Sequence, residues 1–157
     1  MLIDINTYIG HWPFRQLKGS TLDSMLQRMD EFGVDKSVVS NINGIFYKDT
    51  DFANKELYVA VNSREEYQNR FVTFAVMDPV LPWWDRSLEE CDEKYGMRGI
   101  RLYPIYHEYE LTDQRCIDLV KAARDRDLSI TIPQRMIDLR QRSWLDVNEE
   151  LDYSDIA

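Results

Sequence analysis

The stretch Leu22-Asp-Ser-Met-Leu-Gln-Arg-Met-Asp-Glu-Phe-Gly33, followed by the apolar run Lys36-Ser-Val-Val-Ser40, decides the fold class of this chain. Its first part predicts an amphipathic helix, because apolar residues recur at helical spacing at Leu22, Met25, Leu26 and Met29. We expect Gly33 to end that helix in a left-handed conformation and the following run to form a strand. A helix that leads into a strand is half of a strand–helix–strand unit.

The same alternation continues along the chain. Strands are predicted at 2–6, 36–40, 71–76, 98–102 and 129–132, and helices at 22–33, 52–67, 85–95 and 112–127. Ser20 and Asp23 have the spacing of a capping box for the first helix, and Thr112 is expected to cap the last one. Successive strands begin roughly 30 residues apart, which predicts parallel strands joined by right-handed crossovers.

Two architectures are built from such units, the closed (β/α)₈ barrel and the open, doubly wound parallel sheet. Five strands fit an open flavodoxin-like sheet by count. The chain has 157 residues, whereas a full barrel has about 250, so length alone favours the open sheet. The Gly-x-Gly-x-x-Gly fingerprint of dinucleotide-binding sheets is absent from the sequence, which weakens that alternative.

The composition is that of one globular domain with an acidic surface. Nineteen basic against 28 acidic side chains give a net charge of −9, which repels phosphate backbones and anionic lipid, so no nucleic acid or membrane partner is expected. The sequence shows no secretory signal and no apolar run of membrane-spanning length, and we expect a cytoplasmic protein. Cys91 and Cys116 lie on apolar helix stripes and are expected to be buried and unpaired.

Several segments, in their order and spacing, resemble the amidohydrolase-related metal-dependent hydrolases, the amidohydrolase-2 group that includes decarboxylases. They are Ile3-Asp-Ile-Asn-Thr-Tyr-Ile-Gly10 with Trp12–Arg15, Arg28–Val39, Asp51–Asn54, Gly96–Pro104 with His107, and Leu128–Pro133. The resemblance implies an incomplete (β/α) barrel, in which residues 1–140 supply the first five strands and 141–157 form a polar, acidic tail. An unclosed barrel exposes strand edges, so we expect a truncated chain or, alternatively, a homo-oligomer that covers the opening.

The first strand of that family ends in His-x-His, which supplies two metal ligands. Here the two positions are Asn6 and Tyr8, and neither is a usual ligand of zinc. The resemblance thus implies a divalent metal such as zinc while its usual ligands are missing. We therefore assign no metal ligand and expect no cofactor. The two side chains share one face of the strand, where they either contact a substrate or simply end the strand.

The candidates for chemistry lie on strands or in the loops that follow them, at the end of a parallel sheet where barrel enzymes have their active sites. His107, as general acid or base, and Asp138 are the catalytic candidates. The expected substrate-binding residues are Asn6, Tyr8, His11, Arg15, Arg101, Tyr103 and Arg135. A planar guanidinium suits a carboxylate, although ion pairs with the surplus Asp and Glu explain the arginines equally well.

Two functions remain open from the sequence. The first is a hydrolase or decarboxylase of a small carboxylated compound, as the resemblance implies. The second is a metal-free, catalytically inactive binding or structural protein on the same scaffold, which the loss of His-x-His suggests. Both functions predict a small-molecule ligand.

Overall fold

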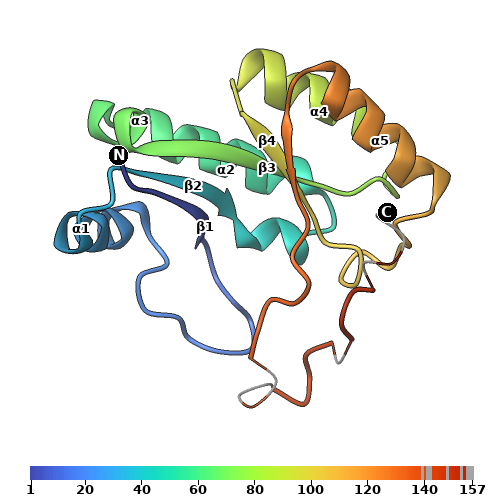
Figure 1. Ribbon diagram of the computed structural model, residues 1–157, viewed down its shortest axis with the longest axis horizontal. Coiled ribbons are helices and arrows are strands. Elements are labelled where there is room, and N and C mark those ends of the chain that lie inside the picture. Colours follow the sequence, from blue (N-terminus) through green and yellow to red (C-terminus); the bar gives the residue numbers. More distant parts are fainter. Residues whose placement is uncertain (139, 141–142, 148, 153, 155–157) are drawn as a thin grey trace.

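The computed structural model describes residues 1–138, 140, 143–147, 149–152 and 154, which form a sheet of parallel strands with helices packed along it (Figure 1). The strands are β1 (Ile3–Ile9), β2 (Lys36–Asn41), β3 (Phe71–Met77), β4 (Gly99–Leu102) and β5 (Ser129–Thr131). The helices are α1 (Leu22–Phe32), α2 (Thr50–Asn62), α3 (Glu65–Arg70), α4 (Trp84–Glu89) and α5 (Gln114–Asp125), with the short turns η1 (Ile42–Ile45) and η2 (Glu90–Lys94). No helix among these residues is long and apolar enough to cross a membrane.

The order of the strands identifies the architecture. They lie side by side as β1-β2-β3-β4-β5, and each is parallel to its neighbours. A doubly wound sheet changes direction, as in the flavodoxin-like order 2-1-3-4-5, whereas a barrel adds every strand on the same side of the previous one. The prediction of an incomplete barrel is therefore confirmed, and the open doubly wound alternative is wrong.

The main core lies between the helices and one face of the sheet. Its members include Met29 of α1, Leu57 of α2, Ala75 of β3 and Leu119 of α5, all almost fully buried. Burying one such large apolar side chain contributes about 1.5–3 kcal/mol. Gly33 ends α1 in the left-handed conformation, as the sequence predicted.

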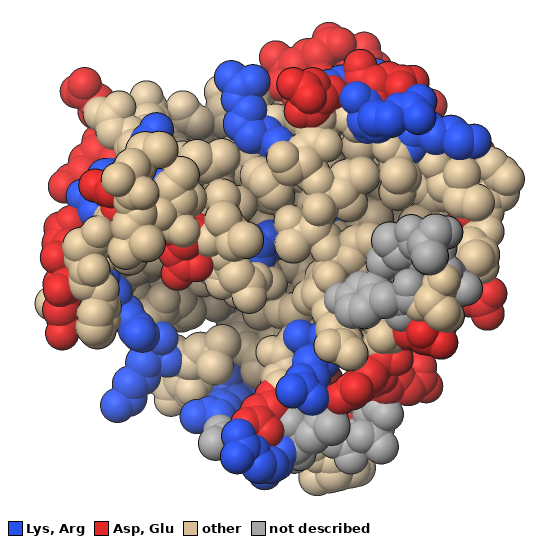
Figure 2. Space-filling view, in the orientation of Figure 1, with Lys and Arg blue, Asp and Glu red and all other residues tan. Residues whose placement is uncertain are grey.

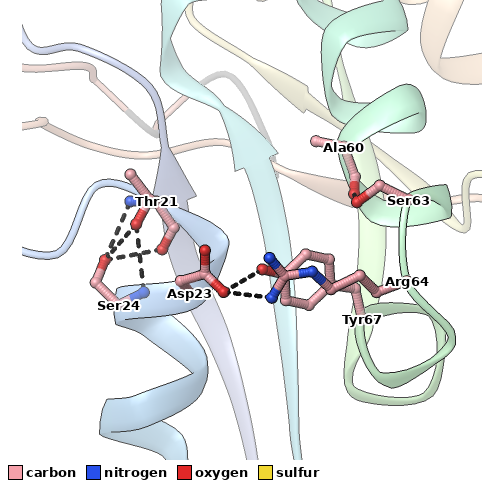
Figure 3. Close-up of polar contacts among 7 residues, drawn as sticks. All are labelled: Thr21, Asp23, Ser24, Ala60, Ser63, Arg64 and Tyr67. Carbon is pink, nitrogen blue, oxygen red and sulfur yellow. Dashed lines mark hydrogen bonds and ion pairs between the residues drawn. The ribbon is translucent and has the colours of Figure 1, made fainter.

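The start of α1 differs from the prediction. Thr21 caps the helix, and its side chain and that of Ser24 form the capping box (Figure 3). The predicted box of Ser20 and Asp23 is wrong, because the carboxylate of Asp23 turns towards α3 instead.

Asp23 joins α1 to α3 through two hydrogen bonds (Figure 3). It accepts from Arg64 Nη1 at 2.7 Å and from Tyr67 Oη at 2.5 Å. The Tyr67 hydroxyl, assisted by the charge of Arg64, lowers the pKa of this carboxyl. These contacts fix α3 beside α1 at the start of the barrel wall.

Two other helix boundaries also differ from the prediction. The predicted helix 52–67 is divided into α2 and α3 near Ser63, whose hydroxyl donates to the carbonyl oxygen of Ala60 at 2.7 Å. The last helix is capped by Asp113 rather than Thr112, and the Asp113 carboxylate accepts from the Arg115 N–H at 2.9 Å. The side chain of Arg115 lowers the pKa of Asp113 to about 2, so the cap is ionised.

β2 and β3 separate before their C-terminal ends. The ladder between them reaches the pair Val39–Thr73 and no further. Beyond it, the buried side chain of Asn54 bonds both backbone groups of Val76, donating to the carbonyl at 2.9 Å and accepting from the N–H at 2.8 Å. The gap admits η1, where Gly44 is required because a Cβ there would lie 2.9 Å from Val76 Cβ.

Replacing Asn54 with alanine removes both partners of the Val76 backbone. Leaving a buried polar group unsatisfied costs about 1–3 kcal/mol, so we expect N54A to lower the free energy of unfolding by about 2–4 kcal/mol in urea denaturation. Asn62 lies on the same helix, exposed, and donates to the Tyr58 carbonyl at 2.9 Å. N62A is the control and should change stability by less than about 0.5 kcal/mol; equal losses in both variants would contradict the role of Asn54.

The two cysteines are free and buried, as predicted. Burial raises the pKa of Cys91 to about 12 and that of Cys116 to about 11. Only the thiolate attacks a disulfide reagent, so the native chain at pH 8 should react slowly with Ellman's reagent and the urea-unfolded chain rapidly. Keeping both thiols protonated also stabilises the folded state, because their pKa values are higher in the folded chain than in the unfolded one. This stabilisation is complete below about pH 8.5 and is lost as the pH rises towards 11–12. Equal labelling rates in both states would show that the thiols are accessible.

Candidate functional site

A pocket of about 330 Å³ opens at the C-terminal end of the sheet. Its walls are Tyr8 of β1, the loop that follows β1, Ile42 of η1 and the segment after β5. Figure 2 shows this face hollowed above its lower edge, with both Lys or Arg and Asp or Glu side chains beside the hollow. This is the end of a barrel at which active sites are built.

The loop after β1 is held in place at both ends. At its base the Gly10 N–H donates to the carbonyl oxygen of Ser20 at 3.0 Å, and the His11 N–H donates to Asn43 Oδ1 at 2.8 Å. Gly10 has a φ of +102°, and a Cβ there would lie 2.5 Å from Asn41 Oδ1. The loop therefore packs directly on the end of β2, and a larger residue at position 10 would displace it.

Aromatic rings stiffen the pocket wall. The ring of Trp12, 4% exposed, meets Phe14 at 5.6 Å, Phe46 at 5.3 Å and Tyr106 at 6.0 Å between centroids, each edge to face. Such pairs contribute about 0.5–1.5 kcal/mol beyond area burial. The aromatic contacts thus tie the loop after β1 to the loops after β2 and β4.

Arg101 of β4 is wholly buried beneath Tyr8. Its Nη2 donates to the carbonyl oxygens of Ile5 on β1 and Val38 on β2, each at 3.1 Å. The guanidinium carbon lies 4.3 Å from the centre of the Tyr8 ring, a cation–π contact. Nε and Nη1 have no hydrogen-bond partner among the described residues. A buried positive charge without a carboxylate is costly, and here it lies directly behind the wall of the pocket.

Three of the residues predicted from the sequence line the pocket: Tyr8, Arg15 and Asp138. A fourth, Asn6, adjoins them, because Tyr8 Oη donates to Asn6 Oδ1 at 2.7 Å. Asp138 is paired with Arg140, which lowers the pKa of the Asp138 carboxyl. The structure therefore gathers these residues at one place, with Asp138 held in its ionised form.

Three other predicted residues do not line this pocket. The side chain of His11 is exposed, and Arg135 forms an exposed ion pair with Glu150 at 2.9 Å. Tyr103 is buried on the same face of the sheet as Arg101, and burial raises its pKa. None of the three is placed to meet a ligand in the pocket as it stands.

His107 is also outside the pocket lining, and the structure does not bring it together with Asp138. Both of its ring nitrogens are buried and lack a well-aligned hydrogen bond within the described part of the chain, although backbone groups of Gly44, Ile45 and Met77 lie close to the ring. Burial lowers the pKa of His107, and the nearby carboxylate of Asp78 opposes that effect. Asp78, which was not among the residues predicted for the site, is therefore an acidic neighbour of His107. Its position directly after β3 was the signal that could have identified it.

The residues present do not fit the metal site that the resemblance implied. Asn6 and Tyr8 stand at the two expected ligand positions and hydrogen-bond to each other. In the described part of the chain, no group of three or more His, Cys, Asp or Glu side chains is arranged to hold a metal ion.

The buried state of His107 predicts a dependence of stability on pH. The unfolded histidine binds a proton near pH 6.5, whereas the folded one has a lowered pKa, so stability should be complete above about pH 6.5 and fall as the pH decreases towards 5. H107Q should flatten this decrease in urea denaturations across that range. His11 is the matched control because its side chain is exposed, and H11Q should keep the wild-type slope. An unchanged slope in H107Q would mean that other groups cause the effect.

No protein-family model matches this sequence, and no curated protein matches it. Solved structures do match. One described as an amidohydrolase, from Staphylococcus aureus, has a TM-score of 0.69 at 19% identity and covers 94% of this chain and 52% of that chain. The 2,6-dihydroxybenzoate decarboxylase from Rhizobium has a TM-score of 0.67 at 13% identity, over 89% of this chain and 51% of that chain.

A third match is 5-carboxyvanillate decarboxylase from Novosphingobium aromaticivorans, solved with manganese and a nitrobenzoic acid. Its TM-score is 0.58 at 17% identity, over 83% of this chain and 50% of that chain. The chain thus spans about half the length of these solved structures. At such identities the likeness concerns the fold, and the described residues have the fold of an incomplete (β/α) barrel of the kind found in amidohydrolases and their related decarboxylases.

Proposed function

We propose that this chain belongs to an amidohydrolase-type barrel that acts as a hydrolase or decarboxylase on a small carboxylated compound. The observation that carries the proposal is the pocket at the C-terminal end of the sheet, with Arg15 in its wall and the buried Arg101 behind Tyr8. The two similar decarboxylases, named for 2,6-dihydroxybenzoate and 5-carboxyvanillate, support a substituted aromatic acid as the substrate class.

The pocket offers complementary surfaces to such a compound. Trp12, Phe14 and Ile42 give an apolar wall for a ring. Arg15 supplies the guanidinium that binds a carboxylate, and the charge of Arg101 behind Tyr8 adds to the attraction. Arg15 and Lys18 in the lining are matched by Asp138 and the buried Asp146. The attraction proposed for an anion therefore rests on Arg15 together with the additional charge of Arg101 behind the wall.

The roles of the candidate acid–base groups follow from their surroundings. Asp138 is ionised and lines the pocket, but its lowered pKa makes it a weak base and suits it better to positioning. His107, with Asp78 near it, is better suited to proton transfer, because an imidazole can both accept and donate a proton near neutral pH. It takes part only if the substrate reaches its buried ring.

A metal-free binding protein is the second candidate function. The hydrogen bond between Asn6 and Tyr8 favours it, because it occupies the positions at which the family holds its metal. In that function the same pocket would hold the same class of carboxylate without converting it.

Binding and turnover separate these functions. We expect hydroxybenzoates to bind in calorimetry and R15A to weaken binding by about tenfold or more, since a hydrogen bond to a charged group contributes about 1.5–3 kcal/mol. Arg124, exposed on α5 and paired with Asp125, is the control, and R124A should bind as wild type.

The same compounds are then incubated with the chain, with and without added manganese or zinc, and carbon dioxide and hydrolysis products are measured. Turnover supports the enzyme, and binding without turnover supports the binding protein. No binding of any carboxylate, or equal binding by R15A, would refute the assignment of the pocket.

A further inference from the structure

A second hollow, which we call the aromatic groove, lies at the same end of the sheet between the start of α2 and the loops after β2 and β3. Its volume is about 820 Å³. Phe46 and Tyr47 come from the loop after β2, Phe52 and Glu56 from α2, and Trp83 from the residues before α4. Phe46, Tyr47 and Phe52 are 38%, 39% and 66% exposed, so several aromatic side chains of the groove lining reach the surface together.

Two carboxylates border these rings. Glu56 is held in place by Asn41 Nδ2, which donates at 3.0 Å, and by Tyr47 Oη at 3.4 Å. Asp49 caps α2 and accepts from the Asp51 N–H at 3.0 Å. Neither Glu56 nor Asp49 forms an ion pair with any described residue.

The charge of the lining favours a cation. Lys48 is the one basic residue against two carboxylates, and the whole chain is acidic. Aromatic faces attract cations through their quadrupole. A primary ammonium is compact and strongly hydrated, whereas an N-methylated ammonium presents methyl groups to the rings and loses little hydration on burial.

We propose that the aromatic groove binds a small N-methylated ammonium compound, with Phe52 and Trp83 against the methyl groups and Glu56 opposite the charge. This site is separate from the pocket lined by Tyr8, Arg15 and Asp138, which we call the carboxylate pocket, and it does not depend on the function proposed for that pocket. The two linings share no residue, and Phe46 of the groove contacts Trp12 and Phe14 of the carboxylate pocket.

Choline and its uncharged carbon analogue 3,3-dimethyl-1-butanol test the proposal by calorimetry, because they differ in charge and hardly in shape. Cation–π contacts contribute about 0.5–2 kcal/mol, so choline should bind about two- to thirty-fold more tightly than the alcohol. F52A and E56Q should each weaken choline binding within that range, and E56Q should also reduce the preference for choline over the alcohol.

Val59 provides the matched control. It is 58% exposed on the same helix and is not part of the groove lining, so V59A should bind choline as wild type. Circular dichroism verifies that each variant is folded, and R15A, which alters the other pocket, should leave choline binding unchanged. Equal affinities for choline and the alcohol, choline binding that survives both F52A and E56Q, or no choline binding by the wild-type chain would each overturn the proposal.

Discussion

The guanidinium of Arg101 is the contact on which the inner face of this sheet depends. It reaches from β4 to the backbones of β1 and β2, which a curled sheet alone makes possible. No described carboxylate pairs with its charge, so two carbonyl oxygens and the face of the Tyr8 ring stabilise the guanidinium instead. One side chain thereby couples the curvature of the half-barrel to the position of Tyr8, and so to the wall of the pocket.

The separation of β2 and β3 has an equally wide effect. Ser40 Oγ donates to the Phe74 carbonyl at 2.8 Å, and Asn54 satisfies Val76, so side chains replace the ladder where the strands diverge. η1 enters the gap and carries Ile42 into the carboxylate pocket. The residues directly after it begin the aromatic groove. Both hollows therefore depend on the same local opening of the sheet.

Much of the fold could be predicted from periodicity and turn residues. The alternation of strands and helices, the left-handed Gly33 and the burial of Cys91 and Cys116 are confirmed. The predicted helix 52–67 is divided into α2 and α3. The other errors concern caps, because neighbouring polar residues compete for the same role. Asp23 had the correct spacing, but its bonds to α3 left the cap to Thr21.

By itself, the sequence determined the order and type of the elements and the replacement of the His-x-His pair by Asn6 and Tyr8, since these depend on residues close together in the chain. Only the tertiary structure decided the sequential strand order, the position of Arg101 behind Tyr8 and the presence of Asp78, rather than Asp138, as the acidic residue near His107. The physical reason is that these contacts join residues from different strands and loops. They form only when the crossovers step in one direction and the sheet curls, which no local pattern encodes.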